Sequence, residues 1–511
     1  MNNHQQNSIM QVSNLRLKFP GESSLIFKDL SFTVSQGEKV LLLGPSGCGK
    51  STLLQVLSGI IPHSIEVPLK CDSIQLPESW GFVFQDPDTQ FCMPYVDEEL
   101  AFVLENLNVP RDKMGPLIGK ALSSVGLPLP EQHILIQTLS QGMKQRLALA
   151  SVLLLKPDVL FLDEPSSLLD PEGTIQIWDS VKEVAAEKTV IIVEHKIDHI
   201  ADWVNRVVLF NDVGEIIADG LPEEIFDQYK QEIAEYGIWY PQVWEDYLVS
   251  TNFKEINTLR RQENLSRLKP QKTIIKLQDF RGYRGKIEKI NIPQAEIDGG
   301  SWITIIGDNG AGKSTLLLSL MHLLRTTGQY ELNGNLINLQ NRKKSPPNEL
   351  SLVFQNPELQ FVTNSVFDEI AFSLRLIGLS ELEIRTRVMS LLELFHLNVN
   401  EQRHPFQLSM GQKRRLSVAT AFAHGTTMLL LDEPTFGQDA RNTFAILEKL
   451  EQLRSGGTTI MMVTHDRRIV ENFATEVWTI DQGKLVKMCA SQNVSEQKRE
   501  EKHCAGIIHT T

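Results

Sequence analysis

The chain repeats itself, and this duplication restricts its fold more than any other feature of the sequence. The paired segments are GPSGCGKST from Gly44 and GDNGAGKST from Gly307, FVFQDPDTQF (82–91) and LVFQNPELQF (352–361), TLSQGMKQRLALA (138–150) and QLSMGQKRRLSVA (407–419), and VIIVEHK (190–196) and IMMVTHD (460–466). The members of each pair lie 263 to 270 residues apart and follow the same order. The sequence therefore predicts two copies of one domain, at 11–250 and 273–488.

The remaining segments are expected to be connections and ends. The stretch from Pro222 to Leu248 is rich in Glu, Tyr and Trp, and we expect it to form a short helical extension of the first copy. Residues 251–272 carry six Lys or Arg and two Glu, which is typical of a basic, solvated linker. Residues 489–511 are polar, and we expect a disordered tail there.

Composition narrows the class of protein. The net charge of -13 argues against general nucleic-acid binding, which leaves a basic footprint. The five cysteines form neither a metal-ligand spacing nor a disulfide framework, which indicates reduced thiols in the cytoplasm. No signal peptide is visible, and no apolar run approaches the roughly 18 to 20 residues that a membrane-spanning helix needs. If the protein works at a membrane, it must dock onto one.

Short apolar runs indicate an α/β fold. KVLLLG (39–44) and WITIIG (302–307) lead directly into glycine-rich loops, whereas VLFLDE (159–164) and MLLLDE (428–433) end in acids. Unbroken runs of this length are typical of strands buried on both faces of a parallel sheet. Ligands of such a sheet bind at the carboxyl ends of its strands.

Both glycine-rich loops satisfy the pattern G-x-x-x-x-G-K-[ST], which predicts two nucleotide-binding sites. Glycines let the backbone curl so that several N–H groups point at phosphates, and the following helix adds its positive end. Lys50 and Lys313 would bridge the outer phosphates, and the hydroxyls of Ser51 and Ser314 could ligate Mg²⁺. A chance match could explain one such loop but not two. The predicted nucleotide-binding residues are Gly44, Pro45, Ser46, Gly47, Cys48, Gly49, Lys50, Ser51, Thr52, Gly307, Asp308, Asn309, Gly310, Ala311, Gly312, Lys313, Ser314 and Thr315.

Two acidic pairs end apolar runs downstream of the loops. Asp163 and Asp432 would hold the Mg²⁺ shell, and Glu164 and Glu433 could orient or deprotonate the attacking water. A lone acidic pair at a strand end would simply be solvated. A repeated pair at a similar distance from each loop lysine favours the catalytic interpretation.

A histidine and a glutamine also recur in each copy. His195 and His465 follow a further apolar strand and could hydrogen-bond the terminal phosphate, although a lone histidine is more often structural. Gln85 and Gln355 could contact Mg²⁺ or water without adding charge. Each could equally be a surface glutamine.

In this order of motifs the chain resembles the ATP-binding-cassette (ABC) ATPases. LSQGM (139–143) and LSMGQ (408–412) are similar to the LSGGQ signature of that family. The resemblance implies two tandem P-loop ATPase domains, each with a mostly parallel core sheet, an antiparallel β subdomain and a helical subdomain. It implies ATP and Mg²⁺ as cofactors, and hydrolysis of ATP.

The resemblance also implies composite sites, in which the signature of one copy faces the phosphate loop of the other. One site would combine Lys50, Asp163, Glu164 and His195 with Ser409 and Gly411, and the other would combine Lys313, Asp432, Glu433 and His465 with Ser140 and Gly142. In this family an aromatic residue before the loop stacks on adenine. Phe19 and Tyr283 are the candidates, with Phe280 competing with Tyr283 and a core role open for each.

Several residues depart from the family pattern. The third signature residue is Gln141 or Met410 instead of glycine, and Met143 replaces the usual glutamine. Glu194 precedes the first histidine, whereas Thr464 precedes the second. The two sites could therefore differ in rate, although both keep the lysine, aspartate, glutamate and histidine.

The repeated F-Q-x-P-x-x-Q-F segment resembles the ATPases of energy-coupling-factor (ECF) importers, which carry vitamins, their precursors, cobalt or nickel. One such group is associated with hydroxymethylpyrimidine or thiamine uptake. The resemblance implies integral-membrane partners, namely a transmembrane coupling protein and a substrate-binding membrane protein. It places the chain at the cytoplasmic face of the cell membrane as a peripheral protein.

Three other classes fit the sequence less well. Tandem ATPases of sugar importers usually carry a degenerate second phosphate loop, and GDNGAGKST is intact. Ribosome-associated ABC translation factors have a longer, strongly charged helical linker than residues 251–272. ABC ATPases of DNA repair usually carry a coiled-coil or zinc insertion, and none is visible.

Acids follow the F-Q-x-P-x-x-Q-F segment in both copies. Glu98, Glu99, Asp368 and Glu369 could receive arginines from the cytoplasmic helices of a membrane subunit. Alternatively, they complement the dipole at the start of a helix.

Overall fold

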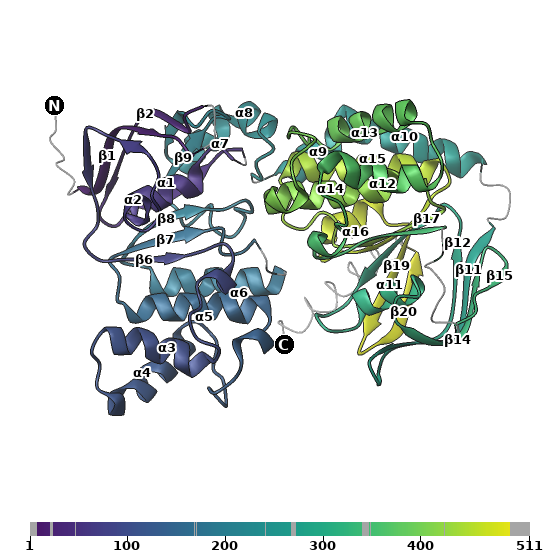
Figure 1. The fold of residues 1–511 in the computed structure, drawn as a ribbon, viewed down its shortest axis with the longest axis horizontal. Helices are drawn as coiled ribbons and strands as arrows, with labels where there is room; N and C mark the ends of the chain where they lie inside the picture. Colours follow the sequence, from purple (N-terminus) through teal and green to yellow (C-terminus); the bar gives the residue numbers. More distant parts are fainter. Residues whose placement is uncertain are drawn as a thin grey trace, which may run out of the picture. The chain divides into compact units, whose positions relative to one another are not determined.

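The computed structural model describes residues 8–490, apart from 21–23, 46, 168, 170, 241, 267–271, 340–346, 348 and 424. The chain divides into two compact units, each drawn in its own range of colours in Figure 1. The first comprises Met1–Val243 with Asp439–Arg441, and the second comprises Trp244–Gln438 with Asn442–Thr511.

The first unit contains a six-stranded sheet in the order β10-β9-β3-β8-β7-β6. Its strands are β3 (Lys39–Leu43), β6 (Trp80–Val83), β7 (Val159–Asp163), β8 (Thr189–Val193), β9 (Arg206–Phe210) and β10 (Ile216–Gly220). All neighbours pair in parallel except β10, which lies antiparallel at one edge. A separate antiparallel sheet is formed by β1 (Ser8–Leu17), β2 (Phe27–Ser35), β4 (Leu69–Lys70) and β5 (Ser73–Gln75).

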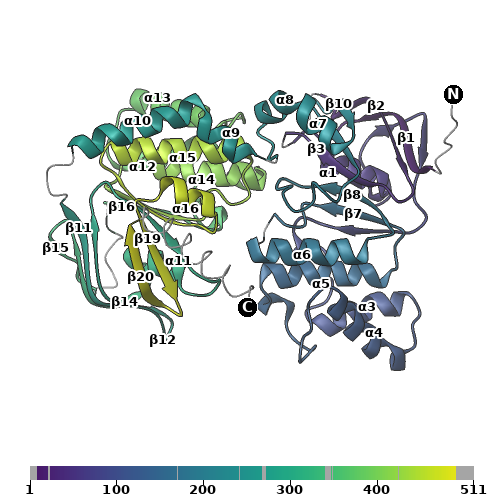
Figure 2. The same ribbon diagram turned by 180° about the vertical axis from the view of Figure 1, so that it is seen from behind.

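The helices of the first unit form two groups. Near the core sheet lie α1 (Lys50–Leu57), α2 (Ile60–His63), α5 (Gln141–Leu154), α6 (Pro171–Val184), α7 (Pro222–Gln228) and α8 (Lys230–Glu235). The helices α3 (Val96–Asn106) and α4 (Arg111–Ser124) pack on α5 and form a helical subdomain beyond it, as Figures 1 and 2 show. Short 3-10 turns are η1 (Pro87–Thr89) and η2 (Ile136–Thr138).

The second unit repeats this plan within one ten-stranded sheet, in the order β15-β14-β11-β12-β20-β19-β13-β18-β17-β16. Its parallel part contains β13 (Trp302–Ile306), β16 (Leu350–Val353), β17 (Met428–Asp432), β18 (Thr459–Val463) and β19 (Glu476–Asp481). The antiparallel part contains β11 (Thr273–Arg284), β12 (Ile287–Asp298), β14 (Arg325–Leu332) and β15 (Asn335–Leu336). The strand β20 (Lys484–Ala490) joins the two parts, because it pairs with β19 and, at one position, with β12.

The second unit also has a helical subdomain. Its helices are α9 (Val243–Val249), α10 (Thr251–Ser266), α11 (Lys313–Leu320), α12 (Val366–Leu376), α13 (Glu381–Leu394), α14 (Met410–Ala423), α15 (Ala440–Ser455) and α16 (Arg467–Phe473), with 3-10 turns η3 (Pro357–Leu359) and η4 (Pro405–Gln407). The helices α12 and α13 pack on α14, as α3 and α4 pack on α5. The predicted α/β class, with core sheet, β subdomain and helical subdomain in each copy, is confirmed.

The strands that carry the predicted acids are buried along their whole length. Every residue of β7, β8, β17 and β18 is buried. Side chains on alternate positions of a strand point to opposite faces, so such a strand must be covered on both sides. This burial explains why the runs read as continuous apolar segments, and it fixes the carboxyl end of each strand as the point where polar residues follow.

The expected solvated linker is wrong for the part of 251–272 that the structure describes. Thr251–Ser266 forms α10, which belongs to the second unit. Phe253 and Ile256 are 7% and 5% exposed. Arg260 donates two hydrogen bonds to the carboxylate of Glu451 in α15, at 2.8 and 3.0 Å. The excess of basic residues indicated solvent, but one of them pairs with an acid that lies 191 positions away in sequence.

The ends of the copies differ only slightly from the predicted boundaries. The compact units divide between Val243 and Trp244, before the expected end of the first copy at residue 250. The predicted helical extension contains α7, α8 and most of α9. Strand β20 runs to Ala490, and the rest of the expected tail lies outside the described residues.

Candidate active sites

Each phosphate loop follows the carboxyl end of a central parallel strand, β3 or β13, and leads into a helix. Gly44 and Gly307 have φ of 152° and 145°, and a Cβ on either would approach a backbone oxygen, of Phe210 at 2.9 Å or of Ile480 at 2.1 Å. Only glycine fits these two positions. By contrast, a Cβ on Gly47 or Gly310 would meet nothing within 4 Å, so open space lies beside these two glycines.

The loop lysines fold back over their own loops. The Nζ of Lys50 donates to the carbonyls of Gly44 and Pro45 at 2.7 and 2.9 Å. Lys313 donates to Gly307 and Asp308 at the same two distances. The helices α1 and α11 begin at these lysines, and neither has a side-chain cap. Their first N–H groups are therefore available to an anion. Ser46 lies outside the described residues.

The aspartates that end β7 and β17 lie beside the serines of the loops. The hydroxyl of Ser51 donates to Oδ1 of Asp163 at 2.7 Å. Burial raises the pKa of Asp163 to about 6, and burial likewise raises the pKa of Asp432 to about 6, against a hydrogen bond from Ser314. Oδ1 of Asp432 is buried without a hydrogen-bond partner.

This donor set fits Mg²⁺. A hydroxyl and one carboxylate are the protein ligands that Mg²⁺ usually takes beside phosphate oxygens and water, because it gives up its hydration shell reluctantly. Among the described residues, no group of three or more His, Cys, Asp or Glu has metal-binding geometry.

In the first copy, both oxygens of Glu164 are engaged. Oε1 lies 2.9 Å from Nε2 of His195, and Oε2 accepts a hydrogen bond of 2.6 Å from Gln85. Glu164 has φ of 48°, in the left-handed region that a bulky residue rarely adopts. Burial raises the pKa of Glu164, but the charge and hydrogen bond of His195 outweigh burial, and the net pKa is lowered.

The second copy repeats this geometry with a looser contact. Glu433 has φ of 52°, and its Oε1 lies 3.3 Å from Nε2 of His465, an ion-pair distance without hydrogen-bond geometry. Arg414, which is 6% exposed, donates to the carbonyl of Glu433 at 3.3 Å. Burial lowers the pKa of Arg414 to about 10. Gln355, the counterpart of Gln85, is exposed.

The signature serines begin helices and face solvent within their own units. Ser140 caps α5, where its hydroxyl accepts from the amide of Met143 at 3.3 Å. Ser409 makes the matching contact with the amide of Gln412 at the start of α14. Both serines are exposed, and a Cβ on Gly411 would meet nothing within 4 Å. Gly142 lies in the first turn of α5, near Leu169.

The F-Q-x-P-x-x-Q-F segments are fastened to the signature helices, a role that sequence reasoning missed. Lys144 of α5 pairs with Asp88 at 2.7 Å, and Lys413 of α14 pairs with Glu358 at 2.5 Å. The second glutamine, Gln360, exchanges hydrogen bonds with Ser417 of α14, at 2.8 Å to its carbonyl and at 2.8 Å from its hydroxyl. The glutamine loop and the signature helix therefore form one connected element in each copy. The sequence did contain a signal for this contact. In both copies an acid follows the proline of F-Q-x-P, and a lysine follows the LSxGx signature.

The predicted adenine-stacking residues take different positions. Phe19 is half-buried against the core of the first unit. Tyr283 is also partly exposed, with the guanidinium of Arg325 5.0 Å from its ring centre. Phe280 is fully buried edge-on against Tyr330, which makes it a core residue.

Of the four acids that could receive arginines or complement a helix dipole, two are buried and hold backbone amides of their own copy. Glu99 is 3% exposed, and its Oε2 accepts from the amides of Cys92 and Met93 at 2.8 Å each. Glu369 is 5% exposed and binds the amides of Val362 and Thr363 in the same way. The third, Asp368, pairs with Arg375 and Ser365. Glu98 is exposed, and the side chain of Asp368 is 41% exposed, so both remain candidates for contact with a partner.

Replacing Glu99 by alanine is expected to destabilise the first unit. Two backbone amides, both in part-buried hydrogen bonds, would lose their acceptor at about 2 kcal/mol, which corresponds to a fall of about 4–8 °C in the unfolding midpoint of a domain of this size. Differential scanning calorimetry of the full chain checks this. The matched change Glu98→Ala on the same helix should leave the midpoint unchanged, and equal midpoints for both variants would contradict the assigned role of Glu99.

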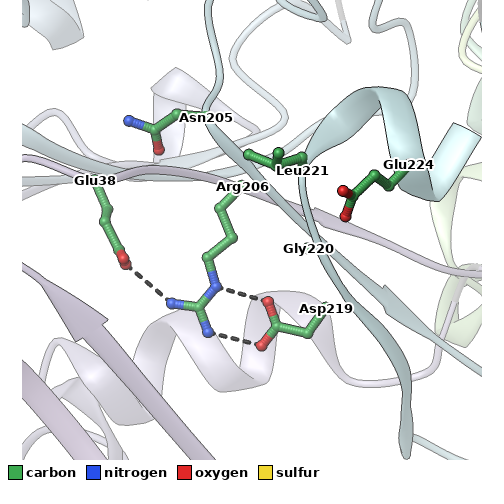
Figure 3. A pocket seen from close by; sticks show the side chains of 7 residues that line it. All are labelled: Glu38, Asn205, Arg206, Asp219, Gly220, Leu221 and Glu224. Atoms are coloured by element: carbon green, nitrogen blue, oxygen red, sulfur yellow. Dashed lines mark hydrogen bonds and ion pairs between the residues drawn. The ribbon is translucent and has the colours of Figure 1, made fainter. Parts of the chain in front are cut away.

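A cavity of about 400 Å³ in the first unit lies at the end of the sheet opposite to the phosphate loop. Figure 3 shows Arg206 between Glu38 and Asp219, with an ion pair to each. Arg206 begins β9 and Glu38 precedes β3, so the cavity is at the amino ends of the strands. Arg206 pairs with two of the cavity's three acids, and the phosphate loop is at the carboxyl ends of the strands.

Comparison with known proteins defines the class. The sequence profile of the family described as "ABC transporter" matches residues 27–167 and 290–436. The chain belongs to this family, it binds ATP, and it is an ATPase.

Relatives of similar length exist. The chain is 34% identical over 501 residues to YkoD of Bacillus subtilis (strain 168), which is named as an HMP/thiamine import ATP-binding protein. The alignment covers 92% of this chain and 89% of YkoD. A Methanosarcina acetivorans protein, named as an ABC transporter ATP-binding protein, is 33% identical and covers 93% of this chain and 85% of its own length. A solved structure titled "Structure of ATP binding subunit of ABC transporter" is 22% identical with a TM-score of 0.40, and covers 44% of this chain and 93% of that chain. Within the described residues, no helix has both the length and the hydrophobicity that a bilayer crossing requires.

Proposed function

We propose that the chain is the energy-coupling ATPase of an ECF-type importer for a vitamin or vitamin precursor. The observation that carries the proposal is the F-Q-x-P-x-x-Q-F segment in both copies, fastened to the signature helix through Asp88 and Lys144, and through Glu358 and Lys413. The relative named for HMP/thiamine import over nearly the whole chain supports hydroxymethylpyrimidine or thiamine as the substrate class.

Each copy would bind one ATP through its phosphate loop, and the signature of the other copy would complete the site. The loops, the acids and the histidine of one site come from the same unit. The exposed Ser140 and Ser409 begin helices whose first N–H groups suit a terminal phosphate. ATP would then hold the two copies together, and hydrolysis would release them.

The chemistry of the site follows from the groups that surround each phosphate loop. Lys50 and Lys313 would exchange their loop carbonyls for phosphate oxygens. Mg²⁺, held by Ser51 with Asp163 and by Ser314 with Asp432, would neutralise phosphate charge when bound. Glu164 and Glu433 would orient the attacking water and accept its proton, and His195 and His465 would donate to the terminal phosphate. Gln85 would hold Glu164 in place until nucleotide binds.

The helical subdomains suit contact with membrane subunits. Large apolar side chains are exposed around η3, α12 and α13 of the second copy: Leu359 (71%), Val362 (68%), Phe372 (47%), Leu376 (73%) and Leu382 (78%). They lie on and next to the segment that joins the glutamine loop to the signature helix. A cytoplasmic helix of a transmembrane coupling protein placed there would be linked directly to the ATP site. The chain would thus be peripheral at the cytoplasmic face.

Uptake measurements test the import function. A strain that lacks this chain should lose uptake of labelled hydroxymethylpyrimidine or thiamine, and the wild-type gene should restore it whereas the Glu164→Gln, Glu433→Gln double variant should not. The tagged chain should copurify from solubilised membranes with a polytopic coupling protein and a smaller substrate-binding membrane protein. Unchanged uptake in the deletion strain, or sedimentation of the chain with ribosomes instead of membranes, would contradict the proposal.

A further inference from the structure

Glu194 is a buried carboxylate to which the proposed reaction assigns no role. It lies between the end of β8 and His195 and is 2% exposed. Burial raises the pKa of Glu194, and a hydrogen bond from Ser166 acts in the opposite direction. A carboxylate so completely removed from water must be held by specific donors.

These donors come from two different loops. Oε2 of Glu194 accepts from the hydroxyl of Ser166 at 2.7 Å and from its amide at 3.3 Å. Oε1 accepts from the amide of His195 at 2.8 Å. Ser166 lies two residues after Glu164, in the loop that follows β7. One side chain therefore connects the loop that carries Glu164 to the loop that carries His195.

Among the described residues of the second copy, no carboxylate stands at the position of Glu194 to make this bridge. Thr464 stands at the matching position, and its hydroxyl accepts from the amide of Asp466, which is in the same loop. The contact between the acid and the histidine is also longer there, 3.3 Å for Glu433 and His465 against 2.9 Å in the first copy.

We infer that Glu194 is a positioning residue of the first ATP site, which fixes His195 against Glu164 and so makes the two sites unequal in their chemical step. The inference rests on the roles proposed for Glu164, Glu433 and the two histidines. Besides burial and hydrogen bonds, the charges of Glu164 and His195 act on the pKa of Glu194, the first raising it and the second lowering it.

Glu194 can affect the rate because the two reacting groups are carried by different loops. Glu164 and His195 follow different strands, so their spacing depends on how firmly the two loops are joined. Losing the bridge leaves the phosphate loop intact. The rate of hydrolysis should therefore fall, whereas the affinity for ATP should not.

Single-turnover hydrolysis by the full chain, with protein in excess over ATP and Mg²⁺ present, tests this inference. In a Glu433→Gln background only the first site reacts, and in a Glu164→Gln background only the second. Adding Glu194→Gln, which keeps the length of the side chain but removes its charge and one acceptor, should slow the first site about tenfold and leave the second within about twofold. The dissociation constant for ATP should stay within about twofold in both backgrounds. The matched control Thr464→Ser should leave both rates unchanged.

An unchanged rate in the Glu433→Gln background, an equal loss in both backgrounds, or a loss explained by weaker ATP binding would each overturn the inference. A separate outcome concerns the roles on which it rests. If the two backgrounds, before Glu194 is altered, do not each hydrolyse at one site alone, then the proposed roles of Glu164 and Glu433 are wrong, and the positioning role falls with them.

Discussion

Changing Glu164 and Glu433 together to glutamine is expected to lower steady-state ATP hydrolysis by at least about 100-fold, because a positioned general base contributes roughly that factor or more. Glutamine has nearly the same shape, but it cannot accept a proton from water. Each carboxylate follows a fully buried strand and lies within 3.3 Å of its histidine. ATP should still bind, since the phosphate loops and Ser51 and Ser314 are unchanged.

Release of phosphate by the purified chain, together with equilibrium binding of a fluorescent ATP analogue, checks both parts. Glu98→Gln is the matched control, because Glu98 is an exposed acid outside both sites. Near-normal turnover in the double variant would show that neither glutamate acts on the water. Loss of ATP binding as well would show that the change disrupts the loops and does not isolate the chemistry.

Replacing Lys50 and Lys313 together by alanine is expected to weaken ATP binding itself, by about 100-fold. A charge-assisted hydrogen bond contributes about twice as much as a neutral one, and each lysine supplies the main positive charge of its loop. The change also leaves the carbonyls of Gly44 and Gly307 without the donors that now reach them at 2.7 Å. The loop should therefore lose both its ligand contact and part of its shape.

Titration with the same fluorescent analogue in the presence of Mg²⁺, carried up to saturation, gives the dissociation constant for this comparison. Lys28→Ala, at an exposed position on β2, is the control and should bind as the wild type does. If the double lysine variant kept wild-type affinity while losing hydrolysis, the lysines would act only in the transition state, and their assigned role in ground-state binding would be wrong.

The sequence was most informative where one residue type alone satisfies the local geometry. The glycines at 44 and 307 and the unbroken apolar strands led to the fold class, the order of the motifs with the LSxGx signature led to the family, and both predictions are confirmed. Ser51 and Asp163, which were each predicted to serve Mg²⁺, are in contact at 2.7 Å. The catalytic roles themselves remain predictions.

Other features depended on partners far away in sequence. The composition of segment 251–272 predicts a solvated linker, since nothing local shows that Arg260 pairs with Glu451. Similarly, Glu99 and Glu369 stand at a helix start, where an acid is usually exposed. Their inward rotamers, which hold backbone amides, follow from packing and not from the sequence pattern. Glu194 differed visibly from Thr464, but its bridge to Ser166 required coordinates.

The proposal that each copy completes the other's ATP site can be tested by determining the structure of the Glu164→Gln, Glu433→Gln chain with ATP and Mg²⁺. Nucleotide on the loop of Lys50 should then accept hydrogen bonds from Ser409 and from the amide of Gly411, and nucleotide on the loop of Lys313 should contact Ser140 and Gly142 in the same way. Bound ATP that reaches no signature serine, whether from the same chain or from a second molecule, would contradict it.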